Sequence, residues 1–217
     1  MILGMDHIAV TSIDLEADGA KLEQLGFRHK FTEIGLKNAE EKKPLLRNWS
    51  KTHDIAYYEG IEGTALELTQ HHARSHEGKS RGFIPVIDES RVMGVIRAVE
   101  DLDKSKMFYS ALGMTPEPWH GHMKFRIDSP VEKLRSSLLM GPTANWEESA
   151  PIFLDDAGFP CIALLTTDLD ADARRLHNEA TQFITDDFRL TVNKQKLRIA
   201  FACGPSGELI ELVQVRQ

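Results

Sequence analysis

The clearest alternation of apolar and polar positions lies near the end of the chain, at residues 196–215. Apolar residues alternate with smaller or polar ones, the Gly-Pro-Ser-Gly sequence at 204–207 supplies turn residues, and a second apolar run follows. This arrangement is typical of a β-hairpin. Within the second run, Glu211 lies between Ile210 and Leu212, so its carboxylate points to the opposite face of the strand. That face must be wet, paired or metal-bound, because burying an isolated charge is too costly.

A second strand, earlier in the chain, carries the same kind of exception. Glu67 lies between Leu66 and Leu68, shortly after Gly63. Period-two alternation again places the carboxylate on the face opposite the two leucines. One such strand could arise by chance, but two at matching places in a repeat indicate a shared role for the two acidic positions.

The same order of elements recurs three times along the sequence. Strand-like stretches begin each copy, at residues 5–11, 92–99 and 160–165. An Asp-Leu pair that can cap a helix follows each of them. The three pairs are Asp14-Leu15, Asp101-Leu102 and Asp168-Leu169. Strand-like stretches return after each helix, so the unit is βαβββ rather than the alternating βαβ of a parallel sheet. We therefore predict an α+β fold with three βαβββ modules.

A polar stretch at residues 73–91 separates the first and second copies and is typical of a linker. We therefore expect residues 1–85 to form the first module and residues 86–217 to hold the second and third modules, paired as one complete domain. A charged insertion at residues 37–53 interrupts the first module, and we expect it on the surface. Three histidines in and beside the linker are interpreted as solvated surface rather than a metal cluster: His71, His72 and His76.

Composition narrows the class of protein. The chain has 217 residues, of which 27% are charged and 41% hydrophobic, which is typical of a globular domain rather than a disordered or fibrous chain. Its net charge of −7, without a long basic run, argues against a nucleic-acid partner or an anionic membrane surface. Its apolar runs are far shorter than the roughly 20 residues that cross a bilayer. The first ten residues do not resemble a signal peptide, so we expect a cytoplasmic protein.

Several common chemistries have no anchor in the sequence. It contains no GxxxxGK phosphate loop, no GxSxG elbow and no CxxC pair, which argues against nucleotide hydrolysis, serine-hydrolase and thioredoxin-like readings. The turn at 204–207 has strands on both sides, whereas a phosphate loop leads from a strand into a helix. Two cysteines, Cys161 and Cys203, favour a reduced pair over a disulfide framework.

A candidate metal half-site follows from alternation in the first copy. His7 shares one strand face with Met5 and Ala9, and Glu67 lies on the face opposite its neighbouring leucines. If the two strands curl towards one another, an imidazole and a carboxylate converge. Nitrogen and oxygen ligands together suit zinc, iron(II), manganese, nickel or cobalt better than calcium or magnesium. Open positions on such an ion would accept two oxygens of a substrate.

Two ligands do not close a metal site, so a second module must contribute. One possibility is the first module of another subunit, which would give two histidines and two glutamates about a two-fold axis. The other is the third module, which would supply Glu211 and Cys161. We expect a homodimer to complete the site, with His7 and Glu67 as the first choice of ligands and Glu211 as the second.

Several motifs together resemble the vicinal oxygen chelate superfamily. They are Asp6-His7-Ile8-Ala9-Val10, Leu25-Gly26-Phe27, Val99-Glu100-Asp101-Leu102, Phe108-Tyr109, and the run from Gly204 to Leu212. That superfamily includes glyoxalase I, extradiol dioxygenases, methylmalonyl-CoA epimerase, fosfomycin-resistance enzymes and bleomycin-binding proteins. The resemblance implies paired βαβββ modules whose curled mixed sheets enclose a cleft, with helices outside. It also implies metal ligands from first strands, usually His, and from last strands, usually Glu.

Transferred to this sequence, the family pattern is only partly met. His7, Glu67 and Glu211 stand at ligand positions, Cys161 takes the place of a histidine in the third copy, and the second copy has Gly94 and no acid on its last strand. The resemblance implies a divalent-metal-dependent lyase, isomerase or dioxygenase acting on a small oxygenated substrate, with Glu67 and Glu211 also in catalytic roles. The alternative is a metal-free protein that sequesters a small molecule, as the bleomycin-binding relatives do.

Other candidates for the cleft have structural alternatives. His120 and His122 share one face of a strand and, with Cys161, are candidates to line a substrate cleft, although packing or surface positions are the favoured explanation of the two histidines. Cys161 lies among apolar residues and is also explained as a small core residue. Glu67 and Glu211 also fit exposed positions of a half-solvated antiparallel sheet, which commonly alternates in this way.

Overall fold

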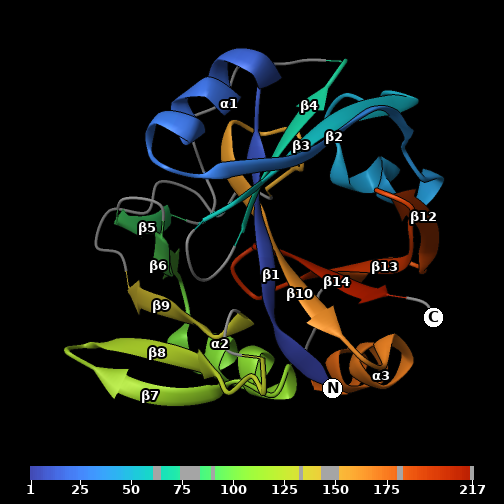
Figure 1. The fold of residues 1–217 in the computed structure, drawn as a ribbon. Coiled ribbons are helices and arrows are strands. Elements are labelled where there is room, and N and C mark those ends of the chain that lie inside the picture. Colours follow the sequence, from blue (N-terminus) through green and yellow to red (C-terminus); the bar gives the residue numbers. More distant parts are fainter. Residues whose placement is uncertain are drawn as a thin grey trace.

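The computed structural model describes residues 1–60, 65–73, 84–88, 91–131, 134–142, 152–179 and 183–215. The chain forms the predicted α+β structure, with two mixed β-sheets and helices on their outer sides (Figure 1). Within the described residues, no helix has both the length and the apolar character needed to cross a bilayer. His76, interpreted from the sequence as solvated, lies outside the described residues.

The larger sheet has nine strands and combines the beginning and the end of the chain. Residues 2–71, the first segment, contribute β1 (Ile2–Thr11), α1 (Leu15–Gln24), β2 (Arg28–Lys37), the 3-10 helix η1 (Glu40–Leu45), β3 (Thr52–Glu59) and β4 (Ala65–His71). Residues 158–215, the third segment, contribute β10 (Gly158–Thr166), α3 (Leu169–Glu179), β11 (Phe183–Ile184), β12 (Phe188–Val192), β13 (Gln195–Cys203) and β14 (Leu209–Val215).

The two halves of this sheet meet at β1 and β10, which run antiparallel in its centre (Figure 1). On one side β4, β3 and β2 follow β1, and on the other side β14, β13 and β11 follow β10, with β12 also paired to β13. In each half the last strand runs parallel to the first. The sequence interpretation paired the second copy with the third, whereas these strands pair the first segment with the third within one chain. The boundary at residue 85 and the threefold repeat remain predictions.

The second segment, residues 84–142, forms a separate five-stranded sheet in the order β5-β6-β9-β8-β7. Its elements are β5 (Ile84–Asp88), β6 (Arg91–Val99), α2 (Leu102–Ala111), β7 (Thr115–Trp119), β8 (His122–Ile127) and β9 (Ser136–Pro142). The edge of β6 that corresponds to the β1–β10 junction is occupied by β5, the strand that immediately precedes it. The register pairs Ile96 with Leu139, so the position that corresponds to Glu67 is apolar in this sheet.

A buried polar cluster joins the second segment to the third. The Arg97 side chain donates to the Ser206 carbonyl oxygen at 3.0 Å, and the Tyr109 hydroxyl donates to Glu208 Oε1 at 3.2 Å. Glu208 Oε2 accepts from the Ser206 amide at 2.8 Å, which fixes the turn between β13 and β14. Arg97 and Glu208 are at most 1% exposed, so opposite charges offset each other inside the molecule.

The helix starts follow the sequence signals. The Asp14, Asp101 and Asp168 carboxylates each accept a hydrogen bond of 3.0 Å from the backbone amide three residues on. Gly26 and Gly113 follow the first two helices with φ values of +89° and +84°, which a side chain would oppose. These caps explain why the Asp-Leu and Leu-Gly pairs recur.

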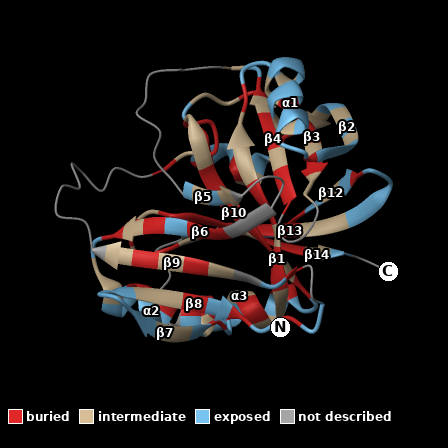
Figure 2. Cartoon of the chain, turned by 60° about the vertical axis from the view of Figure 1, so that its left-hand side comes forward, coloured by how far each residue is buried: buried red, intermediate tan, exposed pale blue. Residues whose placement is uncertain are grey.

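Apolar residues of the central strands fill the core on one face of the large sheet (Figure 2). Ile8, Leu66, Ile162 and Ile210 are all at most 1% exposed there. The opposite, concave face is covered in part by the insertion at residues 37–53, which was expected on the surface. Leu45 in that insertion packs in a second apolar cluster with Ile152, Leu154, Phe188, Phe201 and Val213. The insertion is therefore exposed on one side, as expected, and buried on the other, which the sequence did not predict.

Candidate functional site

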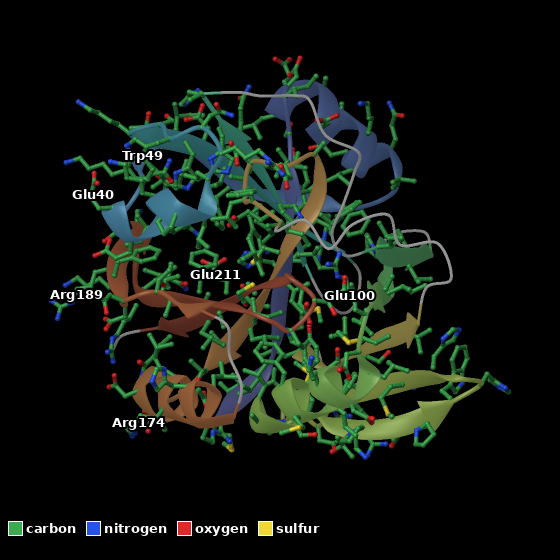
Figure 3. The ribbon with its side chains drawn as sticks, turned by 180° about the vertical axis from the view of Figure 1, so that it is seen from behind. Glu40, Trp49, Glu100, Arg174, Arg189 and Glu211 are labelled. Atoms are coloured by element: carbon green, nitrogen blue, oxygen red, sulfur yellow. The ribbon has the colours of Figure 1, made fainter. Side chains whose placement is uncertain are left out.

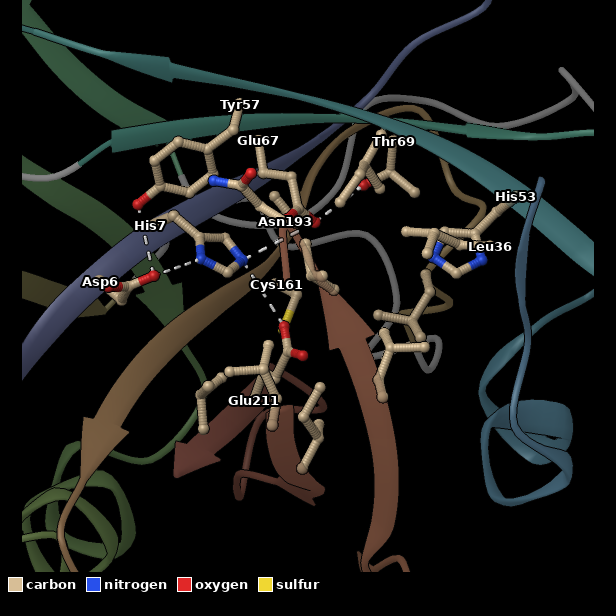
Figure 4. A pocket seen from close by; sticks show the side chains of 18 of the residues that line it. Asp6, His7, Leu36, His53, Tyr57, Glu67, Thr69, Cys161, Asn193 and Glu211 are labelled. Carbon is tan, nitrogen blue, oxygen red and sulfur yellow. Dashed lines mark hydrogen bonds and ion pairs between the residues drawn. The ribbon is translucent and has the colours of Figure 1, made fainter. Parts of the chain in front are cut away.

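A cavity of about 310 Å³ lies on the concave face of the nine-stranded sheet (Figure 4). The first segment supplies a mainly polar wall, which includes Asp6, His7, Lys42, His53, Tyr57, Glu67, Thr69 and His71. The third segment supplies a mainly apolar wall, which includes Phe188, Leu190, Val192, Leu197, Ile199, Phe201 and Val213, with Cys161, Asn193, Gln195 and Glu211 as polar exceptions. In Figure 3, Glu211 points into the molecule, whereas Glu40, Arg174 and Arg189 lie at its outside.

A β-bulge in β1 explains how the first strand presents two neighbouring polar residues to the cavity. The pairing with β10 steps from Met5 to His7 while the partner strand advances by one residue, so β1 holds one extra residue at Asp6. Asp6 and His7 therefore both line the cavity, and Met5 lies in the core instead. Alternation alone had placed Met5 on the face of His7, and the bulge corrects this.

The His7 ring is oriented by Asp6. Its Nδ1 lies 3.0 Å from Asp6 Oδ2, which also accepts a hydrogen bond of 3.4 Å from the Tyr57 hydroxyl. With the Nδ1 proton directed to Asp6, the other ring nitrogen, Nε2, faces the cavity centre. Among the described residues, His7 Nε2 has no hydrogen-bond partner although it is buried. A buried nitrogen of this kind is unusual and requires an explanation.

Two carboxylates from opposite halves of the sheet approach this nitrogen (Figure 4). Glu67 Oε1 lies 3.8 Å and Glu211 Oε2 lies 3.6 Å from His7 Nε2. They occupy equivalent registers, since Ala9 pairs with Glu67 and Ala163 pairs with Glu211. The structure therefore brings together His7, Glu67 and Glu211 within one chain, whereas a second subunit had been expected to complete the set.

His7 and the nearby carboxylates alter each other's pKa values. Burial alone would lower the pKa of His7, but Glu67, Asp6 and Glu211 together raise it well above its usual value. Burial raises the pKa of Glu67, the imidazolium of His7 opposes that rise, and the charge of Glu211 adds to it. Without another cation, His7 carries the positive charge that these carboxylates attract.

Cys161 occupies the position in β10 that corresponds to His7 in β1. It is 1% exposed, lines the cavity and forms no disulfide. Burial raises the pKa of its thiol, so the group is neutral at ordinary pH. The sequence placed Cys161 both as a candidate cleft residue and as a small core residue, and it lies in the apolar cluster at the cavity wall.

Lys42 was missed from the sequence because it belongs to the insertion that was expected outside. It is 9% exposed and lines the cavity, with its Nζ 5.8 Å from the centre of the Phe201 ring. Burial lowers the pKa of this amine, while the charges of Glu211 and Glu67 oppose the change. The Lys42 amine therefore shares the cavity with two carboxylates that favour its charged form.

His53 and His71 were also missed. They face each other across β3 and β4, with ring centres 5.8 Å apart, and both line the cavity. His71 shares its strand face with Glu67 and Thr69, so period two would have found it had the predicted strand been extended to residue 71. The interpretation of His71 as solvated surface is wrong, since it is 4% exposed. His72 is exposed, with its Nε2 3.2 Å from Asp54 Oδ1.

These two buried histidines predict acid sensitivity. Burial lowers the pKa of His53 to about 2 and that of His71 to about 3, below the value of about 6.5 in the unfolded chain. Between about pH 6.5 and 3 the unfolded state therefore binds more protons, and stability falls as pH falls, by up to about 1.4 kcal/mol per pH unit for each histidine. The free energy of unfolding, measured with urea between pH 7 and pH 4.5, should fall less steeply with decreasing pH in H53F/H71F than in the wild type. In the control H29A, at an exposed histidine, the dependence on pH should be unchanged.

The structure does not bring His120 and His122 to this cavity. Both are exposed at the turn between β7 and β8 in the second sheet, where Trp119 packs against His120. His120 has a φ of +46°, a value that fits a turn position. They therefore stay outside the candidate site.

No protein-family model and no curated protein match the chain. Among solved structures it is similar to glyoxalase I from Zea mays, with 17% identity and a TM-score of 0.38 over 97% of this chain and 67% of that one. It is also similar to a "putative dioxygenase" from Bacillus subtilis, with 10% identity and a TM-score of 0.43 over 100% and 64%. A glyoxalase/bleomycin resistance protein/dioxygenase from Alicyclobacillus acidocaldarius has 14% identity and a TM-score of 0.41 over 56% and 89%. The chain spans about two thirds of the first two structures, and these likenesses concern the fold alone.

Proposed function

We propose that the protein is a divalent-metal-dependent enzyme, a lyase, isomerase or dioxygenase of the vicinal oxygen chelate kind, and that its substrate is a small molecule with two adjacent oxygen atoms. His7, Glu67 and Glu211 would hold the ion. The observation that carries the proposal is the buried Nε2 of His7, which lacks a hydrogen-bond partner among the described residues and faces two carboxylates.

The donor set supports a transition metal. Donors that bind one zinc at about 2.0–2.2 Å lie about 3–4 Å apart, and the separations of 3.6 and 3.8 Å from His7 Nε2 fall in this range. As they stand, no three His, Cys, Asp or Glu side chains of the described residues are grouped closely enough to enclose an ion, so metal binding would require these side chains to move. Asp6 on Nδ1 provides the outer carboxylate that commonly orients a metal-binding histidine.

The charges also suit a divalent ion. Asp6, Glu67 and Glu211 bring three negative charges to the cavity, and the Lys42 ammonium brings one positive charge. With His7 neutral, the group keeps a surplus of two negative charges, which one divalent cation balances. A bound ion would supply the positive charge that protonated His7 otherwise provides beside these carboxylates.

The chemistry follows from these roles. When bound, a divalent ion supplies Lewis acidity that stabilises negative charge on a substrate oxygen. Glu67 and Glu211 are the carboxylates within reach of a substrate held beside His7, and either can take or return a proton. The apolar wall formed by the third segment would hold the body of the substrate and exclude water. The substrate class is therefore an amphipathic small molecule with a chelating end and an apolar body.

Metal titration of the purified protein tests the proposal. After dialysis against a chelator, we expect one zinc, manganese, iron(II), nickel or cobalt ion to bind per chain. An ion at 100 times its dissociation constant should stabilise the fold by about 2.7 kcal/mol, which a thermal-shift assay can detect. Elemental analysis gives the stoichiometry. Absence of both binding and stabilisation would refute the metal site.

A metal-free binding protein is the second candidate. The observation that favours it is Lys42, whose buried ammonium already offsets part of the carboxylate charge. In that case the cavity would retain an oxygenated small molecule without chemistry, and metal would bind weakly or not at all. The expected homodimer is a separate proposal, since the ligand set is complete within one chain, and light scattering on the eluted protein tests it.

A further inference from the structure

We propose that His53, His71 and Lys42 form a second polar subsite in the cavity, and that this subsite binds a hydroxyl group of the small molecule. The inference rests on the proposed function for the chelating end of that molecule. It adds a second point of recognition and therefore narrows the substrate class to hydroxylated compounds.

The sheet fixes the position of the two histidines. The antiparallel register of β3 and β4 sets His53 directly opposite His71, with ring planes 23° apart. They are 3% and 4% exposed, and both rings contribute to the cavity wall. His53 appears in Figure 4 on the far side of the cavity from His7. The pair therefore lies in the same cavity as the candidate metal ligands but apart from them.

The ring nitrogens of His53 and His71 can accept a hydrogen bond from a bound molecule. Among the described residues, Nδ1 of His53 and Nδ1 of His71 are both buried without a hydrogen-bond partner. A buried polar atom left without a partner destabilises a protein, and two side by side are unusual. Both rings are neutral at ordinary pH, so each can offer one unprotonated nitrogen as an acceptor.

An uncharged group suits this subsite better than a cation. The charge of Lys42 acts on both imidazoles and disfavours a second positive charge there, so it opposes a metal ion at this place. A hydroxyl can donate its hydrogen to an imidazole nitrogen and accept a hydrogen bond from an ammonium group. It satisfies both kinds of partner without bringing a charge into the buried cavity.

The two polar subsites are separated along β4. Glu67 and His71 lie four residues apart on one face of β4, so their Cα atoms are about 13 Å apart along the strand. A chelating group and a hydroxyl at opposite ends of one aromatic ring span roughly this length once the contacts to a metal ion and an imidazole are included. The apolar wall that the third segment supplies to the same cavity suits such a ring.

A matched pair of chelators tests the inference. Calorimetric titration of the zinc-loaded protein would compare 4-hydroxybenzohydroxamate with 4-methylbenzohydroxamate, which differ only in the donor group. We expect the hydroxyl compound to bind at least tenfold more tightly to the wild type. In His71→Phe this preference should disappear while the methyl compound keeps its affinity, which also shows that the cavity is intact. His29→Phe, at an exposed histidine, serves as the control variant. An equal preference in wild type and His71→Phe would overturn the subsite.

A second measurement separates this inference from the metal site. If neither compound binds, the metal proposal fails, and the subsite is then judged on metal-free protein by nitrogen-detected imidazole spectra during addition of 4-methylphenol. The Nδ1 signals of His53 and His71 should shift as they accept a hydrogen bond, and the His7 signals should stay unchanged. Nδ1 signals that do not respond to millimolar 4-methylphenol would refute the hydroxyl subsite.

Discussion

Replacing His7 by alanine should reduce metal affinity at least 100-fold and remove the thermal stabilisation that a divalent ion gives to the wild type. The imidazole supplies the single nitrogen donor of the set, and the remaining Glu67 and Glu211 carboxylates would favour harder ions with weaker binding. Competition against a metal-sensitive dye measures the affinity of each variant.

Two further variants sharpen this result. Asp6→Asn keeps the size of the side chain but weakens the hold on Nδ1, and we expect it to reduce affinity by about 10–100-fold. His29→Ala removes an exposed histidine of β2 and should leave affinity unchanged. Wild-type affinity in His7→Ala would exclude His7 as a ligand and with it the proposed metalloenzyme.

The largest expected effect on stability is at Glu208. Glu208→Ala should lower the free energy of unfolding by about 3–5 kcal/mol, because it removes a buried carboxylate that offsets the charge of Arg97. Tyr109 and the Ser206 amide would lose an acceptor in the same step. Urea unfolding followed by circular dichroism gives the difference between variant and wild type.

The matched control is a surface ion pair of the second sheet. Glu117 lies 2.8 Å from Arg126 and is 40% exposed, so Glu117→Ala should change stability little. The double variant R97M/E208Q removes both charges and should be more stable than Glu208→Ala. If Glu208→Ala destabilises no more than Glu117→Ala, the buried cluster does not hold the second and third segments together.

Period-two alternation was enough to find the ligand candidates on β4 and β14. Glu67 and Glu211 interrupt apolar runs, and the fold places both on the concave face with their neighbours in the core. His7 was found by the same argument. Asp6 was not, because a bulge turns it towards the cavity, and a bulge depends on how β1 pairs with β10 rather than on the sequence of β1 alone.

The buried side of the insertion at residues 37–53 was not predicted for a related reason. Its charge density is typical of exposed segments, and Lys42 is the kind of residue that seldom lies inside a protein. What buries it is distant in sequence: the Leu154 amide donates to the Leu45 carbonyl oxygen at 2.8 Å, and Arg47 forms a 2.5 Å ion pair with Asp156. Contacts between residues so far apart in the sequence cannot be predicted from local periodicity. The sequence left the pairing of the first segment with the third as one of two alternatives, because copies of one pattern fit equally well as partners.

The split of His7 and Glu211 between β1 and β14 has a consequence for biosynthesis. A ribosome releases the imidazole of β1 long before the carboxylate of β14, so a nascent chain cannot assemble the ligand set until β14 has been synthesised. Contacts so distant along the chain also form slowly. Metal binding by the proposed ligand set should therefore wait until β14 has left the ribosome, and chains that terminate before β14 should be unable to bind metal through this set.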